Sequence, residues 1–168
     1  MKRIVAGVDE VGRGSLIGPV YAAAVILNKN INKKDLKDSK KLSKNKREVL
    51  SKYIKKNSTW AIGKASIVEI EKKNILNASL LAMKRAIIKL KKKPNKVLID
   101  GNKLPDLKNY RLYSVVKGDE KVPSISAASI LAKVARDSLI LNLDRKYKGY
   151  FWCQNFGYGT KQHLNAIK

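Results

Sequence analysis

Short apolar runs alternate with amphipathic stretches along the chain, and this alternation predicts strands and helices in turn. Five short segments predict strands, and they cover residues 3–8, 17–27, 60–65, 97–99 and 112–116. Only residues 9–16, which contain the glycine-rich loop 12–15, separate the first two. Because so short a connection suits neighbouring strands that run in opposite directions, we expect these two strands to pair antiparallel.

Apolar residues at helical spacing predict the helices between these strands. The expected segments are 44–55 after the N-cap Ser43, a start at the capping box Ser66–Glu69, 78–92, a helix from Ser124 or Ser126 through Leu143, and 160–167. One face of the first helix would carry Val49, Leu50, Tyr53 and Ile54. Strands that alternate with helices predict a layered α/β domain.

The length and the apolar pattern bound the organisation of the chain. Its 168 residues contain no internal repeat or long linker, so we expect a single domain over residues 1–168 with a C-terminal helical segment from about 140 to 168. The chain contains no run of about 18 apolar residues, so the sequence predicts no membrane span. Asp9 and Glu10 interrupt the apolar stretch that a signal peptide requires, and the single Cys153 cannot form an internal disulfide. We therefore expect a cytoplasmic protein.

The charge of the chain indicates the class of its partner. Lys and Arg number 37 against 13 Asp and Glu, which gives a formal net charge of +24. Nucleic acid is the first partner to expect for so basic a protein. Only seven of the basic residues are Arg, and the Lys excess accompanies abundant Asn and Ile, so AT-rich coding explains part of it. Lysine binds phosphate as a point charge, and the charge therefore favours contact with the nucleic-acid backbone without indicating a reaction.

The few acidic residues carry the chemical signal. Three predicted strands end on carboxylates, which are Asp9 with Glu10, then Asp100, then Asp119. Ligands gather at strand ends in sheet enzymes, so these carboxylates are able to converge. A cluster of carboxylates repels itself unless cations lie between them, and all-oxygen sites suit Mg²⁺ or Mn²⁺. Two such ions would stabilise the attacking and leaving oxygens of a phosphoryl transfer.

A structural alternative exists for each acid, because Asp at a strand end is common in turns and caps. The pair Asp9–Glu10 poses a further geometric problem, since adjacent side chains of a strand point to opposite faces. Both would serve one site only if the strand ended or kinked there, or if one ligand were a backbone carbonyl. Gly12 and Gly14 make a break at this point reasonable.

Several collinear blocks of the sequence resemble the ribonuclease HII family, the type 2 ribonucleases H. The blocks span nearly the whole chain, and they are residues 7–14 with 18–20, 38–42, 74–76 with 82–83, 98–102, 117–119, 125–134 with 136–137, and 157–160 with 163–164. The first block contains the family's Asp-Glu-x-Gly-Arg-Gly signature as Asp9 to Gly14. One departure lies next to it, because Ser15 stands where the family usually has Pro.

The resemblance implies a ribonuclease H-like fold, in which a mixed sheet is flanked by helices. It also implies an endonuclease that hydrolyses the RNA strand of RNA–DNA hybrids and cuts on the 5′ side of single ribonucleotides in duplex DNA, leaving a 3′-hydroxyl and a 5′-phosphate. Such an enzyme would remove ribonucleotides and RNA primers from DNA. It would act as a monomer with two Mg²⁺ or Mn²⁺ ions, held by the four-acid set Asp9, Glu10, Asp100 and Asp119.

The resemblance also implies roles in substrate binding. Gly12, Arg13 and Gly14 would sense the ribose 2′-hydroxyl largely through backbone groups, and this hydroxyl is what distinguishes RNA from DNA. Tyr158 would stack on the deoxyribose that follows the ribonucleotide. Ser39 and Lys40 would hold phosphate.

Two alternative functions are also compatible with parts of the sequence. A non-catalytic basic protein that binds RNA or DNA would explain the charge but not the acids at strand ends. Another nuclease of the same broad fold, such as a junction resolvase, would not explain Gly12–Gly14 or Tyr158. A lone histidine, His163, is expected to be structural or exposed to solvent, and Asp137 is expected to support its helix or Arg136.

Overall fold

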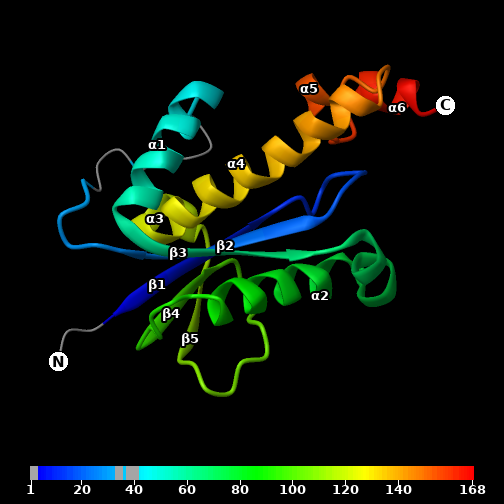
Figure 1. Cartoon of the computed structure of the whole chain (residues 1–168). Coiled ribbons are helices and arrows are strands. Elements are labelled where there is room, and N and C mark those ends of the chain that lie inside the picture. The colour runs from blue at the N-terminus through cyan, green and yellow to red at the C-terminus, as the bar shows by residue number, and fades with distance from the viewer. Residues whose placement is uncertain (1–3, 33–35, 37–41) are drawn as a thin grey trace.

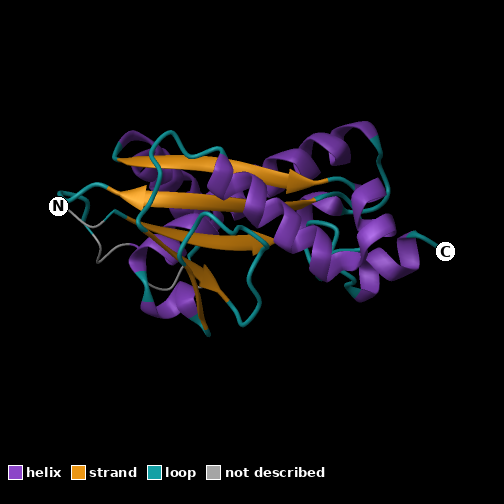
Figure 2. Ribbon diagram, turned by 90° about the horizontal axis from the view of Figure 1, so that it is seen from below, coloured by secondary structure: helices purple, strands orange, loops and turns teal. Residues whose placement is uncertain are grey.

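The structure is a computed structural model that describes residues 4–32, 36 and 42–168. Five strands form one mixed sheet in the order β3-β2-β1-β4-β5 (Figure 2). Their bounds are β1 Val5–Val11, β2 Val20–Leu27, β3 Ser58–Ala65, β4 Lys96–Asp100 and β5 Leu112–Val115. The predicted α/β class and mixed sheet are confirmed. The proposed phosphate-binding residues Ser39 and Lys40 lie outside the described residues.

The strand directions follow from the lengths of the connections. The first two strands are joined by a short loop and pair antiparallel, as predicted, with Gly7 opposite Val25. β3 continues the antiparallel order beside β2. β4 instead pairs parallel with β1, with Val8 opposite Ile99, because the long connection through a helix lets the chain return to the start of the sheet. β5 pairs parallel with β4 after the loop of residues 101–111, which contains no helix.

Helices cover both faces of the sheet (Figure 1). One face packs against α2, and the other packs against α1 and α4. The helices are α1 Lys44–Lys56, α2 Ile67–Ile88, α3 Gly118–Lys121, α4 Pro123–Lys146, α5 Trp152–Asn155 and α6 Lys161–Ala166. Among the described residues, no helix combines the length and the apolar composition needed to cross a membrane.

Alternate residues of β2 supply the core on the two faces of the sheet, as the period of a strand requires. Ala22 and Ala24 pack toward α2, whereas Ala23 and Val25 pack toward α4. These small side chains allow both helices to lie close to the sheet. β1 and α4 come especially close at Gly7, where an added Cβ would lie 2.2 Å from the backbone of α4.

The helix boundaries confirm the predicted capping residues but differ from the bounds that the apolar spacing predicts. Ser43 caps α1, and Ser66 forms a complete capping box with Glu69 at the start of α2. The helix expected over 78–92 is the second part of α2, which is kinked at Asn74 and ends at Ile88. Of the residues expected on one face of α1, Ile54 is buried, whereas Val49 is 67% exposed. α1 buries a narrower face than its apolar content suggests.

The contact of β3 with α2 leaves no room for a side chain at Gly63. A Cβ at this position would lie 2.1 Å from the Ala82 carbonyl oxygen and 2.5 Å from the Ala86 nitrogen, so the helix would have to move. We expect Gly63→Ala to lower the free energy of unfolding by about 1 to 3 kcal/mol. Urea denaturation measures this change. The matched control is Gly159→Ala, whose Cβ meets only side-chain atoms of Leu16 at 3.5 Å or more; an equal loss in both variants would contradict the explanation.

Candidate active site

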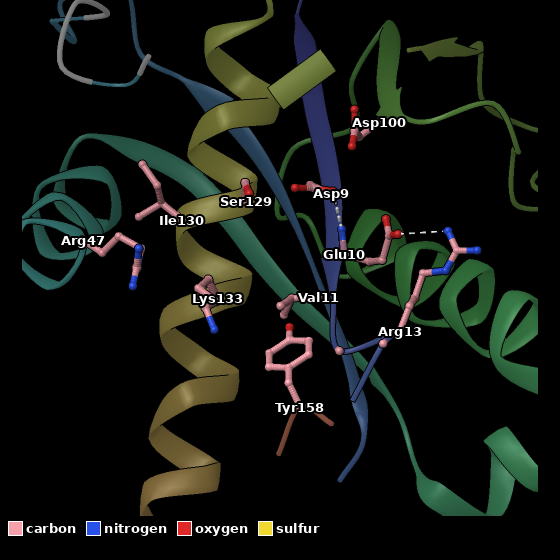
Figure 3. Close-up of a pocket in the computed structure, with 12 residues that line it drawn as sticks. Asp9, Glu10, Val11, Arg13, Arg47, Asp100, Ser129, Ile130, Lys133 and Tyr158 are labelled. Atoms are coloured by element: carbon pink, nitrogen blue, oxygen red, sulfur yellow. Dashed lines mark hydrogen bonds and ion pairs between the residues drawn. The ribbon is translucent and has the colours of Figure 1, made fainter. Parts of the chain in front are cut away.

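The acidic residues of β1 lie where this strand extends beyond its neighbour β4. Pairing with β4 ends at Val8, whereas pairing with β2 continues to Val11. From Asp9 onward, the edge of β1 that faces β4 is therefore open. A pocket of about 420 Å³ occupies this place (Figure 3). Its lining residues are Asp9, Glu10, Val11, Gly12, Arg13, Gly14, Arg47, Asp100, Ser129, Ile130, Lys133 and Tyr158.

The open edge solves the geometric problem of two adjacent acids. The expectation that β1 ends at Asp9 and Glu10 was wrong, because β2 pairs with both residues and the strand continues to Val11. The Asp9 side chain points toward α4 and Glu10 points toward Arg13 (Figure 3). Both still line the pocket because β4 does not pair with this part of β1 and leaves that edge of the strand open.

Asp9 is the most strongly perturbed acid of the pocket. Its side chain is only 5% exposed. Burial raises the pKa of Asp9 well above its usual value, and the charges of Glu10 and Asp100 raise it further. A hydrogen bond from Ser129 and the Glu10 backbone N–H, 2.8 Å from Asp9 Oδ1, oppose this rise in pKa.

Glu10 has a partner of opposite charge. Burial raises the pKa of Glu10, and the Arg13 guanidinium, with Nη1 3.3 Å from Glu10 Oε1, partly offsets this rise. Arg13 is itself about half exposed at the mouth of the pocket. Its charge is thus available both to Glu10 and to an anion in the solvent.

Asp100 and Asp119 are connected through Gly118. Asp100 lies at the end of β4 and points toward Asp9 (Figure 3), and its Oδ1 accepts the Gly118 N–H at 2.6 Å. Asp119 follows directly in α3 and is buried, but it does not line the pocket. The prediction that Asp119 ends a strand was wrong, because a left-handed turn at Lys117 begins a short helix there.

The carboxylates fit a hard divalent cation by their chemistry. As the side chains stand, no three Asp, Glu, His or Cys residues in the described part of the chain are grouped closely enough to hold a metal ion. The donors at the pocket are nonetheless carboxylate oxygens, which suit Mg²⁺ or Mn²⁺. The mutual repulsion that raises the pKa of Asp9 is what a cation between these groups would relieve.

Two segments far apart in the sequence form the other wall of the pocket. The Gly12–Gly14 loop follows β1, and Tyr158 comes from the segment between α5 and α6. An isolated β-bridge between Ser15 and Tyr158 joins them. A Cβ added at Gly14 would lie 3.9 Å from the Tyr158 ring, so the loop and the ring face each other.

Arg136 holds this wall in place. Its guanidinium is fully buried, and burial lowers its pKa. Nη1 donates to the Phe156 carbonyl at 3.1 Å, while Nη2 donates to Ser15 Oγ at 2.6 Å and to the Ile17 carbonyl at 3.0 Å. The sequence predicts that Asp137 supports its helix or Arg136. The negative charge of Asp137 acts on Arg136 from nearby, but the ion pair of Asp137, at 2.8 Å, is with Lys133.

Sequence reasoning missed five residues of the pocket, which are Val11, Arg47, Ser129, Ile130 and Lys133. Ser129 and Lys133 are four residues apart on α4, so helical spacing places them on one face and was the signal that could have found them. Nothing in the sequence indicates that Arg47 of α1 reaches the same pocket.

His163 supports the Tyr158 backbone from the opposite side. It is fully buried, so the structural alternative for this residue is confirmed. The Trp152 indole N–H lies 2.9 Å from Nε2, and an indole nitrogen only donates. Nε2 is therefore the acceptor, and Nδ1 carries the proton that it donates to the Tyr158 carbonyl at 3.0 Å.

Comparison with known proteins gives consistent results. Residues 6–168 match the family model described as Ribonuclease HII. Ribonuclease HII of Pelagibacter ubique is 73% identical over 99% of this chain and 89% of the relative. That of Rickettsia prowazekii is 50% identical over 98% of this chain and 84% of the relative. Ribonuclease H2 from Pyrococcus horikoshii superposes with a TM-score of 0.83 at 28% identity, over 97% of this chain and 84% of that one.

The hydrogen bonds of His163 predict its tautomer. We expect a neutral imidazole with the proton on Nδ1, because Nε2 accepts from Trp152. Long-range ¹H–¹⁵N correlation spectra of the single histidine distinguish the two tautomers directly. The control is Trp152→Phe, which removes the donor and should release this preference. A proton on Nε2 in the unaltered chain would contradict the assignment.

Proposed function

The chain belongs to the ribonuclease HII family, and we propose that it cuts the RNA strand of RNA–DNA hybrids and cleaves on the 5′ side of single ribonucleotides in duplex DNA. Membership of this family makes the chain a metal-dependent ribonuclease H hydrolase. One observation supports the finer proposal more than any other. The pocket places Asp9, Glu10 and Asp100 against a wall formed by the Gly12–Gly14 loop and Tyr158.

In this proposal the acids Asp9, Glu10, Asp100 and Asp119 form the catalytic set and hold two Mg²⁺ or Mn²⁺ ions. When bound, divalent ions stabilise the attacking and leaving oxygens of a phosphoryl transfer, which here leaves a 3′-hydroxyl and a 5′-phosphate. The contribution of Asp119 is supported by its place directly after Gly118, whose N–H holds the Asp100 carboxylate. Ser129 and the Glu10 backbone N–H orient Asp9.

The opposite wall would recognise the substrate. Gly12, Arg13 and Gly14 line the pocket, and their backbone groups would contact the ribose 2′-hydroxyl. Tyr158 would pack on the deoxyribose of the next nucleotide. Lys133 lies beside this ring, with Nζ 5.4 Å from its centre, and would attract the intervening phosphate.

The remaining parts of the proposal concern the surroundings of the site. Ser39 and Lys40 would bind phosphate of the substrate strand, and the net charge of +24 would hold the duplex. The chain would work as a monomeric single catalytic domain in the cytoplasm. Its role there would be to remove ribonucleotides and RNA primers from DNA.

The acids can be tested one at a time. We expect Asp9→Asn or Asp100→Asn to reduce cleavage of a duplex with one ribonucleotide by about a thousandfold or more, because each change removes a charge that binds metal. Duplex binding, measured by fluorescence anisotropy, should persist. Asp106→Asn is the matched control, since Asp106 is exposed and does not line the pocket. A chelator should also stop cleavage; full activity in Asp9→Asn or in chelator would refute the site.

The role of Tyr158 can be tested through specificity. Loss of a stacking ring costs about 1 to 3 kcal/mol, so Tyr158→Ala should lower kcat/KM at a single ribonucleotide by about ten- to a hundredfold. Affinity for an all-DNA duplex should change much less. Tyr113→Ala serves as the control, because Tyr113 is an exposed tyrosine of the edge strand β5. Equal losses in cleavage and in all-DNA binding would argue against stacking.

A further inference from the structure

The hydroxyl of Ser15 lies at the junction of three separate segments. Its Oγ accepts the short hydrogen bond from Arg136 of α4 at 2.6 Å. The same oxygen is 2.9 Å from the Gly157 carbonyl and 3.0 Å from the Ile17 carbonyl. A hydroxyl has one proton, so it donates to one of these carbonyls at a time while it accepts from Arg136. The hydroxyl thus connects the loop after β1, α4 and the segment that carries Tyr158.

The spacing between the loop and this segment is tightly restricted. Leu16 N–H also donates to the Gly157 carbonyl, at 2.8 Å. A Cβ at Gly157 would lie 2.8 Å from Ser15 Oγ and 2.5 Å from Ile17 Cγ1, so the segments cannot come closer. They cannot move apart without breaking the Ser15 hydrogen bonds.

The Tyr158 segment is held independently on its far side. The Tyr158 carbonyl accepts from the Thr160 N–H at 2.8 Å and from His163 Nδ1 at 3.0 Å. These bonds fix the segment to α6 but not to the Gly12–Gly14 loop. The hydrogen bonds that set the position of the ring relative to the loop are made by Ser15, by Leu16 and by Arg136, and Ser15 is the one whose side chain bonds both Arg136 and the Tyr158 segment.

We propose that Ser15 is a positioning residue that sets the distance between the Gly12–Gly14 loop and the Tyr158 ring, and that it thereby sets the preference for a ribonucleotide followed by a deoxyribonucleotide. This inference rests on the proposed function. The loop and the ring contact neighbouring sugars, so an error in their spacing penalises recognition of that junction. A uniform hybrid has no such junction at the cleaved bond. Neither the acids nor the metal depends on this spacing.

The central experiment compares two substrates of equal length, a duplex with one ribonucleotide and a uniform RNA–DNA hybrid. Ser15→Ala should lower the ratio of their kcat/KM values, single ribonucleotide over hybrid, by about tenfold. Ser15→Thr keeps the hydroxyl and should restore the ratio to within about twofold. The matched control is Ser79→Ala, which removes a hydroxyl that bonds the Ile75 carbonyl on α2, on the other face of the sheet.

A double-substitution cycle tests whether Ser15 acts through the ring. When Tyr158→Ala is already present, adding Ser15→Ala should cause no further fall in the ratio, because the spacing then has nothing to position. A further fall of about tenfold in that background would overturn the proposal. If Ser15→Ala does not fold, Ser15→Cys keeps the size but weakens the acceptor, and a smaller fall in the ratio is then expected.

The outcomes separate this inference from the proposed function. An unchanged ratio in Ser15→Ala or Ser15→Cys, or an equal loss on both substrates, would overturn the role of Ser15 while leaving the proposed function intact. Failure of the unaltered chain to cleave either substrate would overturn the proposed function and the inference together. Mn²⁺ affinity, measured by titration calorimetry, should be the same in Ser15→Ala and the unaltered chain; a loss of affinity would show that Ser15 acts on the acids instead.

Discussion

The buried guanidinium of Arg136 is the interaction on which the shape of the site depends. It extends from α4 into the space between the loop after β1 and the segment before Tyr158, and its donors bind acceptors on both. A buried charge that loses an acceptor costs several kcal/mol, about 3 to 5 when a partner is removed entirely, so these segments are held to the positions of their oxygens. Gly12 belongs to the same arrangement, because a Cβ there would lie 2.6 Å from Arg136 Nε.

The pocket contains both acidic and basic side chains, an arrangement that the net charge of the chain does not indicate. The acids lie near the ends of the inner strands β1 and β4, where burial and mutual repulsion raise the pKa of Asp9 and Glu10. Arg13, Arg47 and Lys133 contribute positive charge around the same pocket. These basic side chains attract a polyanion, while the carboxylates at the centre of the pocket still favour a small cation between them. The same pocket can therefore bring together two negatively charged partners, the carboxylates and a phosphate.

The sequence predicted those features that depend on neighbours in the chain. Ser43 and Ser66 cap helices because a cap involves residues within one turn, and the apolar strands were found because their pattern is local. Asp9, Glu10 and Asp100 were located as strand acids that meet at one pocket. The resemblance of collinear blocks supplied the roles that patterns alone left open.

The features that the sequence did not predict depend on distant partners. β1 continues past Glu10 because β2 pairs with it there while β4 has already ended, and no local signal reports the length of a neighbouring strand. The short helix at Asp119 follows from a left-handed turn at Lys117, a conformation uncommon for a lysine. The burial of His163 follows from its contact with Trp152.

The bridge at Ser15 also determines when the site can be completed during synthesis. Ser15 and Gly157 are 142 positions apart, and the bridge needs both the Arg136 donor from α4 and the Gly157 carbonyl acceptor from the segment before α6. On the ribosome, the sheet and its acids are able to assemble while the C-terminal residues are still being added. The wall that would read the sugar forms only after Tyr158 and α6 have emerged. The emerging chain therefore acquires the acidic side of the pocket before the side formed by the Gly12–Gly14 loop and Tyr158.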